Sequence, residues 1–293
     1  MRTLHMRTLY CRTPRFNHFI LRPIRSTTLH KPVTTRLTTT TKQPYAPLAT
    51  MAVPPKFAAH RMAFGQPTSQ SAAVPPTAHS IEIYLDYCVR PHPILLHAYL
   101  ASARRARGTD TYTQQCPFSG KIFNKLLNIV VPLIRSNPTW ASSAQLIFRH
   151  QIQPWHPQST LMHEAALAVN QVAPDKFWAY SKELFAAAQD FFDVNVVNET
   201  RNDTYARLAK LAGKVGADEG EVLKRLRIPS EPVDGSYNIG NAVTNDVKTV
   251  MKMARLTGVH VSPTVILDGI VASEVSSSWE EKEWKEWLTK SIV

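Results

Sequence analysis

Cysteine is scarce in this chain of 293 residues, which contains only Cys11, Cys88 and Cys116. The three lie far apart, whereas a disulfide framework or a zinc site needs several cysteines at close, regular spacing. No segment has the pattern of a secretory signal peptide. We therefore expect reduced cysteines and intracellular chemistry.

Acidic residues are missing from residues 1–61, which hold eleven of the 34 Lys and Arg side chains. The other 23 are balanced by 22 Asp and Glu, so most of the formal charge of +12 belongs to this segment. A near-neutral remainder argues against a nucleic-acid-binding surface. Residues 1–50, rich in Arg and Thr, have the composition of a mitochondrial transit peptide. Because Met51 is a second plausible start, we expect a mitochondrial protein if the leader is translated and a cytoplasmic one if translation begins at Met51.

Several functional patterns are also missing. No apolar run reaches the roughly 18–20 uncharged residues of a membrane span. The sequence contains neither a phosphate-binding glycine loop nor a GxSxG nucleophile elbow, so nothing in it indicates nucleotide binding or serine-hydrolase chemistry. His150, His156, His163 and His260 lack metal-site spacing, so we interpret them as solvated or structural and expect no metal. His156, in a Pro-Trp-His-Pro turn, is the histidine we place nearest to a substrate groove.

The apolar pattern predicts an α/β fold. Residues 51–79, rich in Pro, Ala, Ser and Thr, are expected to form a flexible linker to an ordered domain at 80–293. Parallel pairing of the first two strands is expected, because a helix separates them. Strands are expected at 81–87 and 144–152, and a hairpin at 264–272 with an Asp268-Gly269 turn. A helix is expected at 121–134, ended or kinked by Pro132. Further helices are expected in a helical insertion at 158–240, at 245–256 and at 279–290.

The segment Cys116-Pro117-Phe118-Ser119 precedes the predicted helix 121–134. Unpaired N–H groups and the positive dipole end at a helix start favour thiolate over thiol. Such cysteines have pKa values of about 3.5–7.5, compared with about 8.5 for a free cysteine. Pro117 suits a first helical turn, where its missing N–H has no partner to lose. The segment predicts a nucleophilic or redox-active Cys116 without a second cysteine in its motif.

Together with Val261-Ser262-Pro263-Thr264 before the hairpin, this layout resembles the DsbA-like branch of the thioredoxin superfamily. Glutathione transferases of the kappa class and hydroxychromene-carboxylate isomerases share the layout. The resemblance covers about residues 80–293 and implies a thioredoxin-like fold with an inserted all-helical subdomain. It implies that Pro263 is a cis proline facing Cys116, so that the backbone beside it can pair with an incoming thiol or peptide. Pro117, Phe118, Ser262, Pro263 and Thr264 would then bind substrate.

Ser119 departs from that family pattern, because it stands where the resolving cysteine is expected. Cys116 then forms no disulfide within its motif, although a mixed disulfide with glutathione or a protein thiol can form. The resemblance to serine-bearing kappa-class relatives implies that Ser119 donates a hydrogen bond to a sulfur atom. We expect a thiol-dependent oxidoreductase or glutathione-dependent transferase with catalytic Cys116 and Ser119, glutathione as co-substrate and no bound cofactor. The alternative is a catalytically degenerate binding protein of the same fold.

Residues 88–115 are the second departure, because family members pass from the first strand to the cysteine within one or two residues. Their removal would join Tyr87 directly to Cys116. One hypothesis is a retained intron, since Val89 is encoded by a codon beginning with GT and Gln115 can be encoded by one ending in AG. The other is a lid loop whose arginines attract anionic substrates. Sequencing the transcript across Tyr87–Cys116 distinguishes the two.

Overall fold

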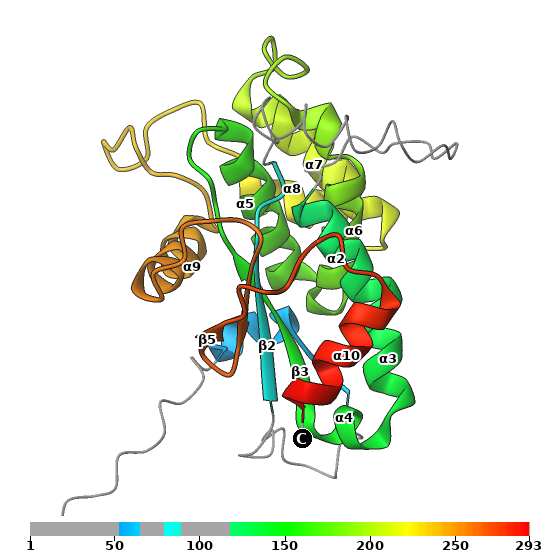
Figure 1. Ribbon diagram of the computed structural model, residues 1–293. Coiled ribbons are helices and arrows are strands. Elements are labelled where there is room, and N and C mark those ends of the chain that lie inside the picture. Colours follow the sequence, from blue (N-terminus) through cyan, green and yellow to red (C-terminus); the bar gives the residue numbers. More distant parts are fainter. Residues whose placement is uncertain (1–52, 65–78, 89–117, 293) are drawn as a thin grey trace, which may run out of the picture. The chain divides into compact units, whose positions relative to one another are not determined.

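The computed structural model describes residues 53–64, 79–88 and 118–292 (Figure 1). These residues all belong to one compact unit of the chain, which spans Tyr45–Val293. The basic leader 1–50 lies outside the described residues, so the transit-peptide hypothesis stays a prediction.

Five strands in the described part of the chain form one sheet in the order β1-β3-β2-β4-β5. The central strands β2 and β3 run parallel, with Ile83 opposite Phe148. The other neighbours are antiparallel, including β2 and β4, where Ile83 faces Val265. The expected parallel pair and the Asp268-Gly269 hairpin are both confirmed. The strands are β1 (Arg61–Ala63), β2 (His79–Leu85), β3 (Ala144–His150), β4 (Thr264–Leu267) and β5 (Ile270–Val271).

Residues 53–64 correct one prediction, because they are part of the fold and not of a flexible linker. The 3₁₀ helix η1 (Pro55–His60) leads directly into the edge strand β1, which pairs with β3. Phe57 and His60 are buried, and the indole N–H of Trp178 donates to the carbonyl of Ala59 over 2.9 Å. Phe57 among prolines and alanines is too short an apolar signal to reveal a segment held by distant contacts.

The helix expected after the cysteine motif begins at Ser119. It runs through α2 (Ser119–Lys125), a π-helical turn η2 (Leu126–Val130) and α3 (Val131–Ser136). Pro132 has no N–H to donate, and the chain changes its hydrogen-bond register directly before it, with the N–H of Val131 donating to the carbonyl of Leu126. Asn137 then caps the short helix α4 (Pro138–Ser143) with its side-chain oxygen.

A block of helices fills the chain between β3 and β4, as expected. Its buried stripes include Tyr180 and Leu184 on α6 and Leu208 and Ala212 on α7. Residues 227–243 contain neither helix nor strand, and α9 follows them. The elements are α5 (Pro157–Val172), η3 (Pro174–Lys176), α6 (Phe177–Ala186), η4 (Ala188–Phe191), α7 (Arg201–Lys214), α8 (Glu219–Leu226) and α9 (Thr244–Leu256).

The two faces of the sheet are covered differently. Ile81, Ile83 and Leu85 alternate into the main core, which also takes in α2, α5, α6 and the final helix α10 (Glu281–Ser291). Tyr84 lies on the opposite face in a smaller cluster that includes Ala254 of α9. Figure 1 shows α9 on one side of β2 and β3 and α10 on the other. None of the helices in the described ranges is long and apolar enough to cross a membrane.

Candidate active site

The predicted cysteine motif is only partly within the described residues. Cys116 and Pro117 lie outside them, so their predicted roles stay predictions. Phe118 is half-buried and directly precedes α2. Ser119 is the first residue of α2, and its side chain is completely buried.

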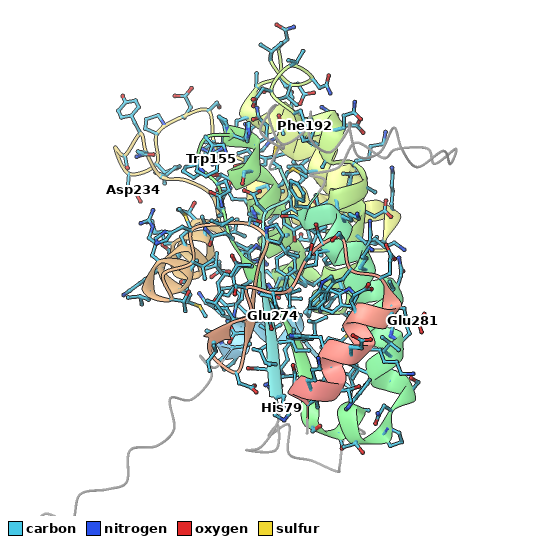
Figure 2. All side chains as sticks on the ribbon, in the orientation of Figure 1. His79, Trp155, Phe192, Asp234, Glu274 and Glu281 are labelled. Carbon is cyan, nitrogen blue, oxygen red and sulfur yellow. The ribbon has the colours of Figure 1, made fainter. Side chains whose placement is uncertain are left out.

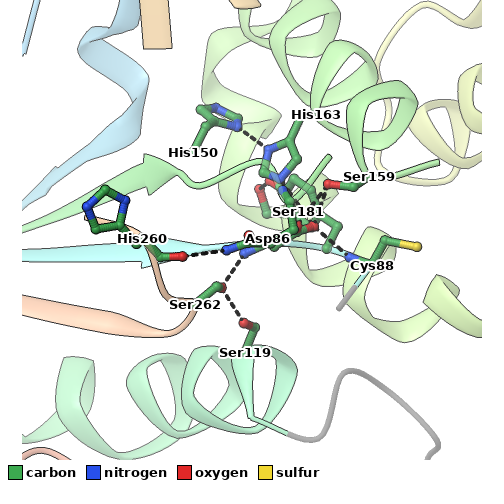
Figure 3. Close-up of polar contacts among 11 residues, drawn as sticks. Asp86, Cys88, Ser119, His150, Ser159, His163, Ser181, His260 and Ser262 are labelled. Carbon is green, nitrogen blue, oxygen red and sulfur yellow. Dashed lines mark hydrogen bonds and ion pairs between the residues drawn. The ribbon is translucent and has the colours of Figure 1, made fainter. Parts of the chain in front are cut away.

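Ser119 meets the second predicted motif. Its Oγ lies 2.8 Å from the Oγ of Ser262, at hydrogen-bond distance, although the two residues are 143 positions apart. The Ser262 hydroxyl also accepts a hydrogen bond of 2.8 Å from the backbone N–H of Asp86. Figure 3 shows these two contacts in a row, from α2 through the chain before β4 to the end of β2. The described parts of both motifs therefore lie at one place, at the carboxyl end of β2.

The chain beside Ser262 has the predicted backbone geometry, because the Ser262–Pro263 peptide bond is cis. Ser262, Pro263 and Thr264 are all half-buried, and Val261 is exposed. Thr264 begins β4, pairs with Tyr84 of β2, and donates its hydroxyl to the carbonyl of Val261 over 2.7 Å. This contact holds the turn against the amino-terminal end of β4.

Asp86 lies behind the two serines and is a residue that the sequence reasoning missed. Its buried carboxylate accepts hydrogen bonds from the backbone N–H groups of Cys88 (2.9 Å) and Gln153 (2.7 Å). The hydroxyl of Ser159, in the first turn of α5, lies 2.8 and 2.9 Å from its two oxygens. A buried carboxylate needs such donors to offset the loss of water. One signal was available in the sequence, an acidic residue directly after an apolar strand.

Two buried histidines continue this polar cluster into the core. The Nδ1 atoms of His150 and His163 are 2.6 Å apart, and Nε2 of His163 lies 3.5 Å from an Asp86 oxygen. One Nδ1 must donate and the other accept. If His163 carries a hydrogen on Nε2, that hydrogen faces the carboxylate, and Nδ1 of His163 accepts from His150.

Burial keeps His150 and the neighbouring His60 uncharged. It lowers the pKa of His150 well below its usual value, and the neighbouring His163 and His60 add to the effect. Burial also lowers the pKa of His60 to about 3, with a smaller contribution from Arg149. Among the described residues no group of three or more His, Cys, Asp or Glu side chains is placed to hold a metal. The burial of His150 and His163 and their contact with each other fit the structural interpretation.

The other histidines and the tryptophan near the predicted groove are more exposed. His156 directly precedes α5 and pairs with Asp193 at 3.1 Å. The ring of His260 is exposed, while its carbonyl accepts a hydrogen bond from the Gln153 amide. Trp155 is 62% exposed, on the turn after β3 (Figure 2). None of the three belongs to the Ser119–Ser262–Asp86 row.

Of the predicted insert 88–115, only Cys88 lies within the described residues. It is buried in the main core, and its N–H is held by Asp86. Removal of 88–115 would place Cys116 directly after Tyr87, at the position that Cys88 now has. The origin of the remaining insert stays a hypothesis.

Comparison with known proteins supports the architecture. No protein-family model and no curated protein matches the chain. The structure is similar to that of a proposed protein-disulfide isomerase from Pseudomonas syringae, with 21% sequence identity and a TM-score of 0.51, over 80% of this chain and 99% of that one. It is also similar to oxidised BdbD from Bacillus subtilis, with 16% identity and a TM-score of 0.45 over 74% of this chain and 88% of that one. A third similar structure is that of reduced DsbG, a disulfide bond oxidoreductase from Mycobacterium tuberculosis. Its sequence identity is 16% and its TM-score 0.41, over 80% of this chain and 86% of that one.

The likeness to the Pseudomonas structure establishes the fold. The chain has an α/β, thioredoxin-like fold, with a helical block inserted between β3 and β4. The expected fold class is confirmed.

Proposed function

We propose that the protein is a thiol-dependent oxidoreductase that acts through a single cysteine, Cys116. The observation that carries this proposal is the 2.8 Å contact between Ser119 and Ser262, because it joins the cysteine motif to the segment before Pro263. The shared fold with a proposed protein-disulfide isomerase adds support. Cys116 precedes Ser119 by three positions in the sequence.

The reaction is thiol–disulfide exchange in two steps. The Cys116 thiolate attacks a substrate disulfide RS–SR′, forms the mixed disulfide Cys116–S–SR, and releases R′S⁻, which takes up a proton from solvent. A second thiolate then attacks the mixed disulfide, forms a new disulfide with R, and regenerates the Cys116 thiolate. Electrons are conserved, because each step breaks one S–S bond and forms another.

The second thiol comes from outside the motif because Ser119 stands where a second cysteine would be needed. A serine forms no disulfide, so the mixed disulfide with Cys116 is resolved by glutathione or by a protein thiol. A serine hydroxyl that donates to the thiolate favours the charged form of cysteine and lowers its pKa. We therefore assign Cys116 as nucleophile and Ser119 as its hydrogen-bond donor, with Phe118, Pro263 and Thr264 beside the incoming thiol.

Thiol labelling at pH 6 tests this function. The full-length protein is treated with a thiol probe, and the labelled peptides are mapped. We expect rapid labelling of Cys116, because a stabilised thiolate is populated at pH 6, and slow labelling of the buried Cys88. Glutathione-dependent disulfide exchange should be lost in Cys116→Ser and kept in Cys88→Ser.

Two results together would overturn the proposal: a Cys116 that titrates like a free cysteine, and no glutathione-dependent exchange in the wild-type protein. They would leave the alternative, a binding protein of thioredoxin-like fold without thiol chemistry.

A further inference from the structure

The segment 53–64 is attached to one edge of the sheet. Its strand β1 is three residues long, is the outermost strand of the described sheet on this side, and pairs with β3. The helix η1 before it is held by the indole N–H of Trp178, which donates to the carbonyl of Ala59, and by an ion pair of 2.6 Å between Lys56 and Asp246 of α9. A short edge segment can separate from its neighbour while the other strand pairs stay formed.

His60, the last residue of η1, is a buried titratable group in this attachment. Its side chain is 3% exposed, and its ring stacks on Phe57 and on Phe177 of α6, with centroids 5.1 and 4.1 Å apart. The buried ring of His150 lies 4.9 Å away. The Nε2 atoms of His60 and His150 have no hydrogen-bond partner among the described residues. Aromatic faces do not replace the hydrogen bonds that both nitrogens of a protonated ring donate.

The surroundings of His60 leave little room to solvate a charge. A cavity of about 10 Å³ lies beside it, which is room for about one water molecule. The described residues that line this cavity include Tyr84, Arg149 and His150 and no carboxylate. A proton on His60 would therefore lie close to the cation of Arg149 and to a second histidine.

The carboxylates on the neighbouring elements are bound to other groups. They are Glu82, bound to Arg149, Asp246, bound to Lys56, and Asp86, which faces His163 and accepts from backbone N–H groups. A protonated His60 in the closed segment would have no counter-charge of its own. Burial, with a smaller contribution from Arg149, accordingly lowers the pKa of His60 to about 3.

We propose that His60 makes the attachment of the segment 53–64 sensitive to acid, so that η1 and β1 separate from β3 at low pH while the rest of the fold stays formed. In the open segment the ring enters water and takes up one proton from it, which stabilises the open state. Above about pH 6.5 the open segment gains no proton. Below that pH, each unit should raise the open population by up to about tenfold for each proton taken up. The cysteine motif has no part in this inference, which stands independently of the proposed function.

Hydrogen exchange of the native full-length protein, followed by mass spectrometry of its peptides, tests the proposal. The protection factor of residues 57–63, taken against the unstructured exchange rate at each pH, should fall by about eightfold or more between pH 6 and pH 5. Residues 205–212, in the buried part of α7, report global unfolding and should stay better protected. Equal protection of the two regions at both pH values would overturn the proposal, because the segment would then open only with the whole protein.

Substitutions separate the histidine from the other attachments of the segment. His60→Phe removes the titrating ring and keeps most of the stacking, so the fall in protection of residues 57–63 should be about eightfold smaller than in the wild type. His60→Gln, which carries no titrating group either, gives the same test if the phenylalanine variant does not fold. Lys56→Met is the matched control, because it removes the ion pair to Asp246 and no histidine. It should lower the protection at both pH values and leave the pH dependence unchanged.

The variants also define the contrary result. If the fall in protection between pH 6 and pH 5 is as large in a folded His60 variant as in the wild type, His60 is not the group that takes up the proton, and the proposal is overturned.

Discussion

The carboxyl end of β2 and the helical block between β3 and β4 are held together in different ways. At the end of β2, Asp86 joins Cys88, Gln153 and Ser159, while its N–H holds Ser262, all through directed hydrogen bonds. The helical block contains buried apolar stripes such as that of Leu208 and Ala212.

The two regions should therefore respond differently to the substitution of a buried side chain. A directed network has defined partners, and the loss of one group leaves several others unsatisfied in the core. An apolar stripe loses contact area when a side chain is shortened, and the effect stays local. We therefore expect mutations at the end of β2 to disturb both stability and the candidate site, and mutations in the block to disturb stability alone.

The largest effect is expected for Asp86→Ala. It removes the acceptor of two backbone N–H groups and one hydroxyl, all buried, so we expect the free energy of unfolding to fall by about 4 kcal/mol. Urea unfolding measures the change. Ser159→Ala is the control, since it removes one donor and should cost about 1 kcal/mol. If the free energy of unfolding fell equally in the two variants, Asp86 would not be the residue that holds this network together.

A smaller effect, confined to stability, is expected for Leu208→Ala on α7. Shortening this fully buried side chain should lower the free energy of unfolding by about 3 kcal/mol. Lys210→Ala, on the exposed side of the same helix, should change it by less than about 0.5 kcal/mol. The alkylation rate of Cys116 should match the wild type in both variants. A changed rate in folded Leu208→Ala would show that the two regions are coupled.

The pH dependence of stability should reveal the buried histidines His60 and His150. His60 and His150 have lowered pKa values in the folded protein, so below about pH 6.5 the unfolded chain binds protons that the folded chain does not. Their contribution to stability is present above that pH and is lost as the pH falls, by about 1.4 kcal/mol per pH unit for each histidine.

His60→Phe isolates one of these protons. The ring of His60 stacks on Phe57 and Phe177, so a phenylalanine there should keep most of the packing. Urea unfolding at pH 7, 6 and 5 should give a pH dependence that is shallower by about one proton than in the wild type. An unchanged slope would mean that His60 does not remain neutral in the folded protein.

The sequence predicted the regular parts of this fold better than its directed contacts. Periodic stripes such as Ile122, Phe123 and Leu126 and the Asp268-Gly269 turn are local signals, and the corresponding helix and hairpin are present. The segment 53–64 was assigned to a linker, because its order depends on contacts of Ala59 and His60 with residues more than a hundred positions away.

The residues of the candidate site also fall into a group that local motifs predicted and a group that they did not. Ser119, Ser262, Pro263 and Thr264 could be chosen because two short motifs resemble a family pattern, and the described parts of those motifs do meet. Asp86 was missed although it directly follows an apolar strand, and the contact between His150 on β3 and His163 on α5 was not predicted, because a single polar residue has no local pattern that reveals its partners. Cys116 and Pro117 lie outside the described residues, so their part of the site is still a prediction.

The central claim is that Cys116 is the reactive thiol of the chain. Incubation of the native full-length protein with oxidised glutathione, followed by peptide mapping by mass spectrometry, tests it most directly. We predict a glutathione mixed disulfide on Cys116 and none on the buried Cys88, with release of the adduct by reduced glutathione. An unmodified Cys116, or equal modification of Cys116 and Cys88 only after unfolding, would contradict the claim.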